Sequence, residues 1–297
     1  MKNGILCINK PQGFTSFDVI GKLRGILKMR RLGHAGTLDP MATGVLPVFV
    51  GTATKACSIL PDTDKTYIAG FKLGLMSDTL DITGKIVAEI TPSADRERVE
   101  EVLKPLRGDI IQTPPMYSAV SVNGKRLYEL ARMGIKVERP KREVTVYELR
   151  LEEFSEETFE GKLFISCGKG TYVRSIIEDM GYKLGCGAIM TSLVRCTSSG
   201  ITLDRCHTFE EVEKAVANNT IDDMIIPVEN IFKFLPALHL NEAQTGMYKN
   251  GVKLDLDKVY DTDKGDRFSV YGYDGEFIGT AKKDTENNLL KIEKNFF

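Results

Sequence analysis

The pattern of apolar and polar residues predicts β-strands through the first two thirds of the chain. Several stretches are short apolar runs bounded by polar residues, which is typical of buried strands. Residues 143–154 instead alternate between apolar and polar positions, as expected of a half-buried strand, and residues 158–167 are a plausible partner for them. The predicted strands are residues 4–9, 45–50, 65–74, 143–154, 158–167 and part of 188–201.

Apolar residues at helical spacing predict helices between these strands. We expect Ser16 and Ser93 to cap two of them, because a serine hydroxyl satisfies a free N–H of the first turn. Thr208 and Glu211 form a capping box at the start of a third, and a fourth is expected to end at Gly185. The apolar face of the first helix would consist of Phe17, Ile20, Leu23 and Leu27. Shorter helices are predicted at residues 53–60 and 125–133.

These elements predict the fold class and the division of the chain. Strands and helices mix without a strict βαβ rhythm, which favours an α+β fold with a mixed, mostly antiparallel central sheet and flanking helices. Two prolines in residues 225–236 indicate a linker, and the Asp274-Gly275 pair beyond it predicts a hairpin. We therefore expect a large domain at residues 1–235 and a small β-rich domain at residues 236–297.

Composition adds one constraint on binding. The chain has 297 residues and a net charge of −1, so contact with a nucleic acid would depend on local basic patches. One patch ends at Arg30 and Arg31. A stronger one lies at residues 123–142, a polar and glycine-marked stretch that we expect to project as an arm. The basic residues of this arm are Lys125, Arg126, Arg132, Lys136, Arg139, Lys141 and Arg142.

Several classes of protein are disfavoured. No apolar run approaches the roughly 18 residues needed to span a membrane, and the run at the N-terminus is far too short for a signal peptide. The six cysteines include no Cys-x-x-Cys pair and the chain has three histidines, so we expect no metal site and the reduced thiols of a cytoplasmic protein. Neither a dinucleotide fingerprint nor a phosphate-binding Gly-x-x-x-x-Gly-Lys-Ser/Thr motif is present, so we expect no cofactor.

The residues with the strongest chemical pattern are 33–44, which read Gly-His-Ala-Gly-Thr-Leu-Asp-Pro-Met-Ala-Thr-Gly. Three glycines allow close, irregular turns, and Pro40 restricts the backbone of Asp39. Asp39 is then either a reacting carboxylate held on a stiff backbone or the N-cap of a helix that begins at Pro40. The residues alone leave both interpretations open.

The sequence of residues 33–44 closely resembles the signature of the TruB family of tRNA pseudouridine-55 synthases. Lys65-Thr66-Tyr67 and Gly170-Thr171-Tyr172-Val173-Arg174 match further family motifs, and the resemblance covers roughly residues 4–235. It implies the pseudouridine synthase fold and an enzyme that isomerises uridine 55 in the T-loop of tRNA by base flipping. It also implies Asp39 as the nucleophile, with Tyr67 and Arg174 as its catalytic partners.

The resemblance assigns further residues to the substrate. Lys10 lies in a further family motif, residues 10–16. This motif is expected to support residues 33–44, which we call the central loop. Lys10 is also a candidate contact for the substrate. His34 is placed against the RNA loop, and Tyr172 and Leu193 match residues of the pocket that receives the base. The last sixty residues resemble the small RNA-binding β domain, called PUA-like, that often follows. The two basic patches, rather than the resemblance, indicate which residues contact the RNA backbone: Arg30, Arg31, Lys125, Arg126, Arg132, Lys136, Arg139 and Arg142.

Together these features predict an enzyme that binds the T-arm of tRNA as a monomer and needs no protein partner. Two rivals stay open. One is a synthase with the same chemistry that depends on a guide RNA and partner proteins. The other is an RNA-binding folding factor without essential chemistry.

Overall fold

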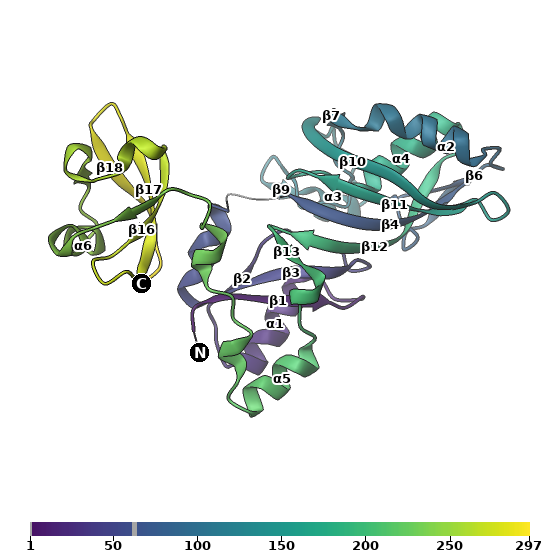
Figure 1. Ribbon diagram of the computed structural model, residues 1–297. Coiled ribbons are helices and arrows are strands. Elements are labelled where there is room, and N and C mark those ends of the chain that lie inside the picture. Colours follow the sequence, from purple (N-terminus) through teal and green to yellow (C-terminus); the bar gives the residue numbers. More distant parts are fainter. Residues whose placement is uncertain (1, 61–63) are drawn as a thin grey trace.

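The computed structural model describes residues 2–60 and 64–297, which form two large β-sheets and two two-stranded ones, with helices around them (Figure 1). The path of the central sheet is β1 (Gly4–Lys10), β3 (Thr43–Val50), β12 (Ala188–Ser198), β4 (Lys65–Leu73), β11 (Glu160–Cys167), β10 (Arg142–Ser155) and β7 (Gly108–Gln112). Off this path, β2 (Leu32–His34) pairs with β3 and β13 (Ile201–Thr202) pairs with β12. Two small hairpins join β5 (Leu75–Ser77) to β6 (Ile86–Glu89) and β8 (Ser121–Val122) to β9 (Lys125–Arg126).

Helices cover the central sheet in two groups (Figure 1). One group packs on β1 and β3 over a core that includes Leu6, Val19 and Val212, and the other packs on β4, β10 and β12 over a second core. The α-helices are α1 (Ser16–Leu27), α2 (Arg96–Leu103), α3 (Leu127–Arg132), α4 (Val173–Leu184), α5 (Phe209–Ala217) and α6 (Glu242–Lys249). The 3-10 helices are η1 (Gly51–Ser58), η2 (Lys104–Leu106), η3 (Leu203–Arg205), η4 (Ile221–Asp223), η5 (Val228–Ile231), η6 (Leu256–Lys258) and η7 (Thr262–Lys264).

The two halves of the central sheet meet at a parallel pairing between β3 and β12. All other neighbours along the path pair antiparallel, so the predicted mixed, mostly antiparallel sheet is confirmed. At this seam Gly44 lies opposite Arg195, and a Cβ on Gly44 would lie 2.2 Å from the carbonyl oxygen of Arg195. Its φ of +102° is also one that side chains rarely adopt. A glycine is therefore required where the central loop enters β3.

The predicted β-rich C-terminal part is confirmed as a five-stranded sheet with its own core. Its order is β14 (Ala237–His239), β16 (Arg267–Tyr271), β17 (Phe277–Asp284), β18 (Leu289–Asn295) and β15 (Leu254–Asp255). The hairpin predicted from Asp274-Gly275 joins β16 to β17. The segment before it, expected as a linker, is packed instead: Phe232 is fully buried and contacts the rings of Phe277 and Phe296. The division at residue 235 stays a prediction.

Two predicted helix caps are wrong by one or two positions. Thr15, not Ser16, caps α1, in a capping box with Asp18. Ser16 is buried because its hydroxyl points inward and exchanges hydrogen bonds with the backbone of Leu38. Phe17, predicted on the apolar face, is exposed, and Val19 takes the buried position. Likewise Asp95, not Ser93, caps α2.

The remaining helix predictions have mixed outcomes. The capping box of Thr208 and Glu211 is confirmed for α5, and Gly185 ends α4 in the left-handed conformation. The predicted helix at residues 125–133 is shorter, since its first two residues pair in the β8–β9 hairpin. Within the described part of the chain, no helix is both long and apolar enough to cross a membrane.

We predict opposite effects of two glycine-to-alanine changes. Gly44→Ala should lower the free energy of unfolding by more than about 2 kcal/mol, because the methyl group collides with β12 and φ is strained. Gly25→Ala in α1 should raise it by about 0.5–1 kcal/mol, since nothing lies within 4 Å of the added Cβ and alanine favours helix. Urea unfolding of both variants measures the difference, and equal stabilities would contradict the role of the seam.

Candidate active site

The middle of the segment 33–44, residues 36–39, lines a pocket of about 320 Å³. The loop before β3 forms one wall, β4 and β12 contribute the floor, and the N-terminus of α4 closes another side. The residues that line the pocket are Gly36, Thr37, Leu38, Asp39, Lys65, Tyr67, Ser118, Ala119, Gly168, Lys169, Gly170, Thr171, Tyr172, Val173, Arg174 and Leu193.

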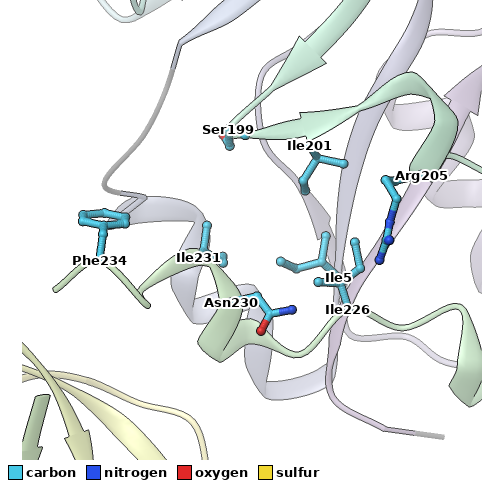
Figure 2. A pocket seen from close by; sticks show the side chains of 9 residues that line it. Ile5, Ser199, Ile201, Arg205, Ile226, Asn230, Ile231 and Phe234 are labelled. Atoms are coloured by element: carbon cyan, nitrogen blue, oxygen red, sulfur yellow. The ribbon is translucent and has the colours of Figure 1, made fainter.

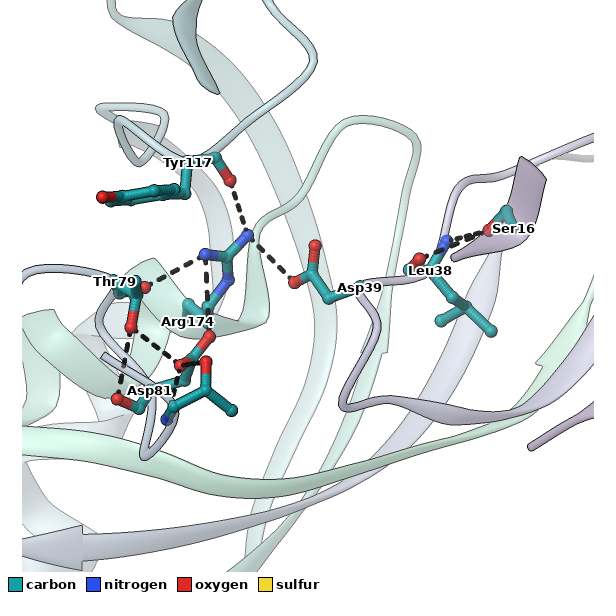
Figure 3. Close-up of polar contacts among 8 residues, drawn as sticks. Ser16, Leu38, Asp39, Thr79, Asp81, Tyr117 and Arg174 are labelled. Atoms are coloured by element: carbon teal, nitrogen blue, oxygen red, sulfur yellow. Dashed lines mark hydrogen bonds and ion pairs between the residues drawn. The ribbon is translucent and has the colours of Figure 1, made fainter. Parts of the chain in front are cut away.

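Asp39 and Arg174 meet at this pocket, although they lie far apart in the sequence. A guanidinium nitrogen of Arg174 lies 2.9 Å from Oδ2 of Asp39 (Figure 3). The Arg174 side chain is 5% exposed and that of Asp39 is 35% exposed, so the arginine is held inside the protein and the carboxylate borders the pocket. Arg174 also donates to the carbonyl oxygens of Thr79 at 3.0 Å and Tyr117 at 2.9 Å. The guanidinium is therefore locked in one orientation.

A second carboxylate, Asp81, lies on the other side of the guanidinium. Its Oδ2 is 3.8 Å from Nη1 of Arg174, and its Oδ1 accepts hydrogen bonds from Thr79 and Thr83 (Figure 3). Asp81 lies in the turn between β5 and β6 and is not among the residues predicted for the site. The Thr-x-Asp-x-Thr pattern is a signal for a carboxylate fixed by its own turn, but it does not reveal that Arg174 lies beside it.

The pKa of Asp39 depends on its burial and on its charged neighbours, chiefly Arg174 and Asp81. Burial raises the pKa of Asp39, Arg174 lowers it and Asp81 raises it again, with a net increase over the usual value. Burial is the leading cause because the carboxyl group faces a pocket walled by protein, even though 35% of the side chain is exposed. Arg174, the expected catalytic partner of Asp39, therefore only partly offsets the effects of burial and of the second acid on this pKa.

The loop that carries Asp39 is fixed from behind by Lys10. This side chain is fully buried, and its ammonium donates to the carbonyls of Pro11, Phe14 and Pro40 at 2.9, 2.6 and 3.3 Å. Burial lowers the pKa of Lys10 to about 8. The geometry fits the expected support of the loop but not direct contact of Lys10 with a substrate. After Asp39 the chain turns into β3, so the helix-cap interpretation of Asp39 is wrong.

The other predicted pocket residues divide into two groups. Tyr67 on β4, Leu193 on β12 and Tyr172 before α4 all line the cavity. Burial raises the pKa of Tyr67 to about 12, so its phenol is neutral at physiological pH. His34 lies in β2 outside the lining, with a buried Nδ1 that has no hydrogen-bond partner in the described chain. Burial, and then the charge of Arg195, lower the pKa of His34.

Comparison with known proteins identifies the family. Residues 24–173 match the model of the TruB family pseudouridylate synthase N-terminal domain, and residues 174–233 match the tRNA pseudouridylate synthase B C-terminal domain. The chain belongs to the TruB family of pseudouridylate synthases. This confirms the resemblance on which the sequence analysis relied.

Relatives of the family match along most of their length. The tRNA pseudouridine synthase B of Geobacillus thermodenitrificans is 44% identical over 260 residues, which is 86% of each chain. That of Bacillus subtilis is 41% identical over 305 residues and covers 99% of this chain and 97% of its own. The structure of a Cbf5-Nop10-Gar1 complex superposes with a TM-score of 0.76 at 24% identity, over 99% of this chain and 85% of that one. The predicted pseudouridine synthase fold is thereby confirmed.

In this TruB family chain the basic arm begins at the rim of the pocket. Ser118 and Ala119 line the cavity, and the β8–β9 hairpin and α3 follow directly. Two predicted RNA contacts are half-buried: Arg139 donates to the carbonyl of Pro114 at 2.9 Å, and Arg142 lies over the ring of Tyr172. The other predicted contacts are exposed, and they are Arg30, Arg31, Lys125, Arg126, Arg132 and Lys136. Three of these also have partners within the protein, since Arg31 donates to Thr54, Arg126 donates to the carbonyl of Ala119, and Arg132 lies over the ring of Tyr128.

A larger hollow of about 430 Å³ lies where β1 and the β13 segment meet residues 226–234 (Figure 2). Its lining is mostly apolar, and Arg205 is the one ionisable side chain among the described residues that form it. This hollow holds no acid, thiol or histidine, whereas the smaller pocket is lined by Asp39. The described residues also contain no cluster of three or more metal-ligating side chains.

The raised pKa of Asp39 predicts that this residue costs stability. An acid whose pKa is higher in the folded state destabilises the fold once pH exceeds its unfolded value of 3.8, fully so above the folded pKa. Asp39→Asn should therefore melt at a higher temperature than wild type at pH 7, and the gain should vanish towards pH 4. Thermal unfolding across this pH range measures the effect.

Asp18→Asn is the matched control with the opposite sign. Hydrogen bonds from Thr15 lower the pKa of Asp18, so its ionised form stabilises the fold above pH 3.8 and is lost as pH falls. This variant should melt at a lower temperature at pH 7. Destabilisation by both substitutions would show that the Asp39–Arg174 ion pair outweighs burial.

Proposed function

We propose that this chain isomerises uridine 55 in the T-loop of tRNA to pseudouridine, with Asp39 as the nucleophile. Its relatives carry the name tRNA pseudouridine synthase B over nearly the whole chain. The observation that carries the proposal is the carboxylate of Asp39 at the edge of a pocket, 2.9 Å from a buried guanidinium that fixes its orientation.

The reaction needs only what such a pocket can supply. The bond between N1 and C1′ of the uridine breaks, the uracil turns, and C5 bonds to C1′ while the C5 proton is given up and N1 takes one. Atoms and electrons balance without an oxidant, a reductant or an energy source. Asp39 adds either to the ribose or to the base and is released unchanged. The ionised form of Asp39 is required, and Arg174 favours it against burial.

The pocket is small and lies within the protein, so the base has to leave its stack to reach Asp39. A cavity of about 320 Å³ has room for one extruded uracil. Tyr67 and Leu193 lie on neighbouring strands and form a wall for that base, where stacking on an aromatic ring contributes roughly 1–3 kcal/mol. Tyr172 borders the opposite side, at the N-terminus of α4.

The arm gives the RNA a binding surface beside this pocket. Its exposed cations would neutralise phosphates next to the flipped nucleotide, which compensates for a net charge near zero. The proposed enzyme acts as a monomer in the cytoplasm, without cofactor, metal or protein partner. Conversion of uridine in an unmodified tRNA transcript by the purified chain tests this. Absence of turnover that partner proteins or a guide RNA restore would favour a guide-dependent synthase.

Removal of the nucleophile should abolish turnover. We expect Asp39→Asn to lower the rate of pseudouridine formation in a T-arm hairpin at least about a thousandfold, because an amide cannot form the covalent intermediate. Tritium release from 5-tritiated uridine measures the rate. Asp18→Asn, which alters only a helix cap, is the control and should retain turnover. Turnover by wild type that is lost in Asp39→Asn would show that the chain has chemistry that depends on Asp39. If the variant retains activity, Asp39 is not the nucleophile.

Charge reversal in the arm should change the salt dependence of binding. We expect Lys125→Glu with Lys136→Glu to weaken hairpin binding and to flatten the plot of log affinity against log salt by roughly one unit per lost phosphate contact. These two residues are chosen because both are exposed and the structure gives them no internal ion pair among described residues. Lys104→Glu, an exposed change outside the arm, is the control. An unchanged slope in the double variant would remove the arm from the interface.

A further inference from the structure

Arg195 carries a buried positive charge that the chemistry above does not use. The residue lies in β12 with no exposed surface, and its Nε donates to the carbonyl of Val45 at 2.7 Å. Its Nη1 and Nη2 are also buried and have no hydrogen-bond partner among the described residues. Burial of a charged group with unsatisfied donors costs free energy, so such a group calls for a specific reason.

The guanidinium lies behind the pocket, between the central loop and Tyr67. In the sheet Arg195 is opposite Tyr67 on β4 and opposite Gly44 on β3. A Cβ on Gly36 would lie 3.1 Å from Nη1, so the loop that carries Asp39 passes directly over the guanidinium. The unused donors therefore lie next to a residue that lines the pocket.

The charged neighbours of Arg195 do not neutralise it. Lys10 and His34 both have a pKa lowered by burial, and the charge of Arg195 lowers each further. Tyr67 is a neighbour whose negative form Arg195 favours: burial raises the pKa of this phenol, Arg195 opposes the rise through its charge and through a side-chain contact, and Cys167 and Asp39 add to it. The two side chains are therefore already close, although neither Nη1 nor Nη2 meets hydrogen-bond geometry. The same phenol is the leading group that favours the charged form of Arg195.

We propose that Arg195 is a positioning residue that acts through Tyr67. When a base fills the pocket, the N–H groups of Arg195, which already lie beside Tyr67, close into hydrogen bonds with its phenol oxygen, and the O–H of Tyr67 is directed at the base. A phenol oxygen can accept hydrogen bonds while its own proton is donated elsewhere, so one contact orients the other. A charged donor at that oxygen also makes the phenol a stronger hydrogen-bond donor. The inference rests on the proposed function, because it needs a base in the pocket.

Nitrogen NMR of the arginine side chains tests the contact directly. The sample is the Asp39→Asn protein, in which a T-arm hairpin stays unreacted, with and without Tyr67→Phe. We expect hairpin binding to slow rotation of the Arg195 guanidinium about tenfold when Tyr67 is present, since a hydrogen-bonded Nη cannot rotate freely, and to leave it unchanged in the sample that carries Tyr67→Phe. Arg267, which pairs with Glu293 far from the pocket, is the internal reference and should not change.

The outcomes separate the two proposals. If the hairpin shifts no pocket resonance, the proposed function fails. If the hairpin binds but Arg195 rotates equally fast with and without it, the role of Arg195 is overturned. The same conclusion follows if hairpin binding slows that rotation by the same factor whether or not the protein carries Tyr67→Phe.

A double-mutant cycle tests the consequence for the reaction. Arg195→Lys should lower kcat about tenfold in wild type, with little change in KM, but less than about twofold in the Tyr67→Phe background. A purely structural role would give the same factor in both backgrounds and overturn the inference. Arg267→Lys is the matched control and should leave kcat unchanged. If Arg195→Lys does not fold, as thermal unfolding would show, the NMR comparison decides alone because every protein in it retains Arg195.

Discussion

The ion pair of Asp39 with Arg174 is the interaction on which the pocket depends. The same guanidinium binds the backbone of Thr79 and of Tyr117, so one buried cation ties the signature loop, the turn after β5 and the root of the arm to the start of α4. Charge-assisted hydrogen bonds are about twice as strong as neutral ones, which lets one side chain hold several irregular segments. None of those segments belongs to a regular element that could position it otherwise.

This arrangement has an electrostatic cost, because two carboxylates share one guanidinium in a partly closed space. Burial and Asp81 raise the pKa of Asp39, so the form needed as a nucleophile is not the form that the fold favours. Active sites commonly carry such destabilising groups, which the rest of the fold offsets. Lys10 favours the ionised form of Asp39 from the opposite side of the loop, but its own ammonium is buried and its pKa is lowered to about 8, even though three carbonyl oxygens hold it.

The sequence predicted well what local pattern controls. Alternation and apolar runs located the central strands, and Asp274-Gly275 located a hairpin, because side-chain period and turn chemistry act over a few residues. Caps were predicted less well: Ser16 has the chemistry of a cap, but a contact with Leu38 turns it inward. Asp81 and Arg195 could not be assigned from local pattern, since their roles depend on partners brought close only by the fold. The resemblance of residues 33–44 supplied the site, which composition alone would not reveal.

The order of strands in the central sheet has a consequence for synthesis of the chain. β3 and β4 follow each other in the sequence, yet β12 lies between them and pairs with both. A growing chain therefore has a gap in its sheet until residue 198 has left the ribosome, and such non-local pairing is slow to form. Leu193 and the first residues of α4, which line the pocket, are also synthesised late in the chain. Until then the nascent protein would expose the facing edges of β3 and β4, which makes aggregation during synthesis a greater hazard.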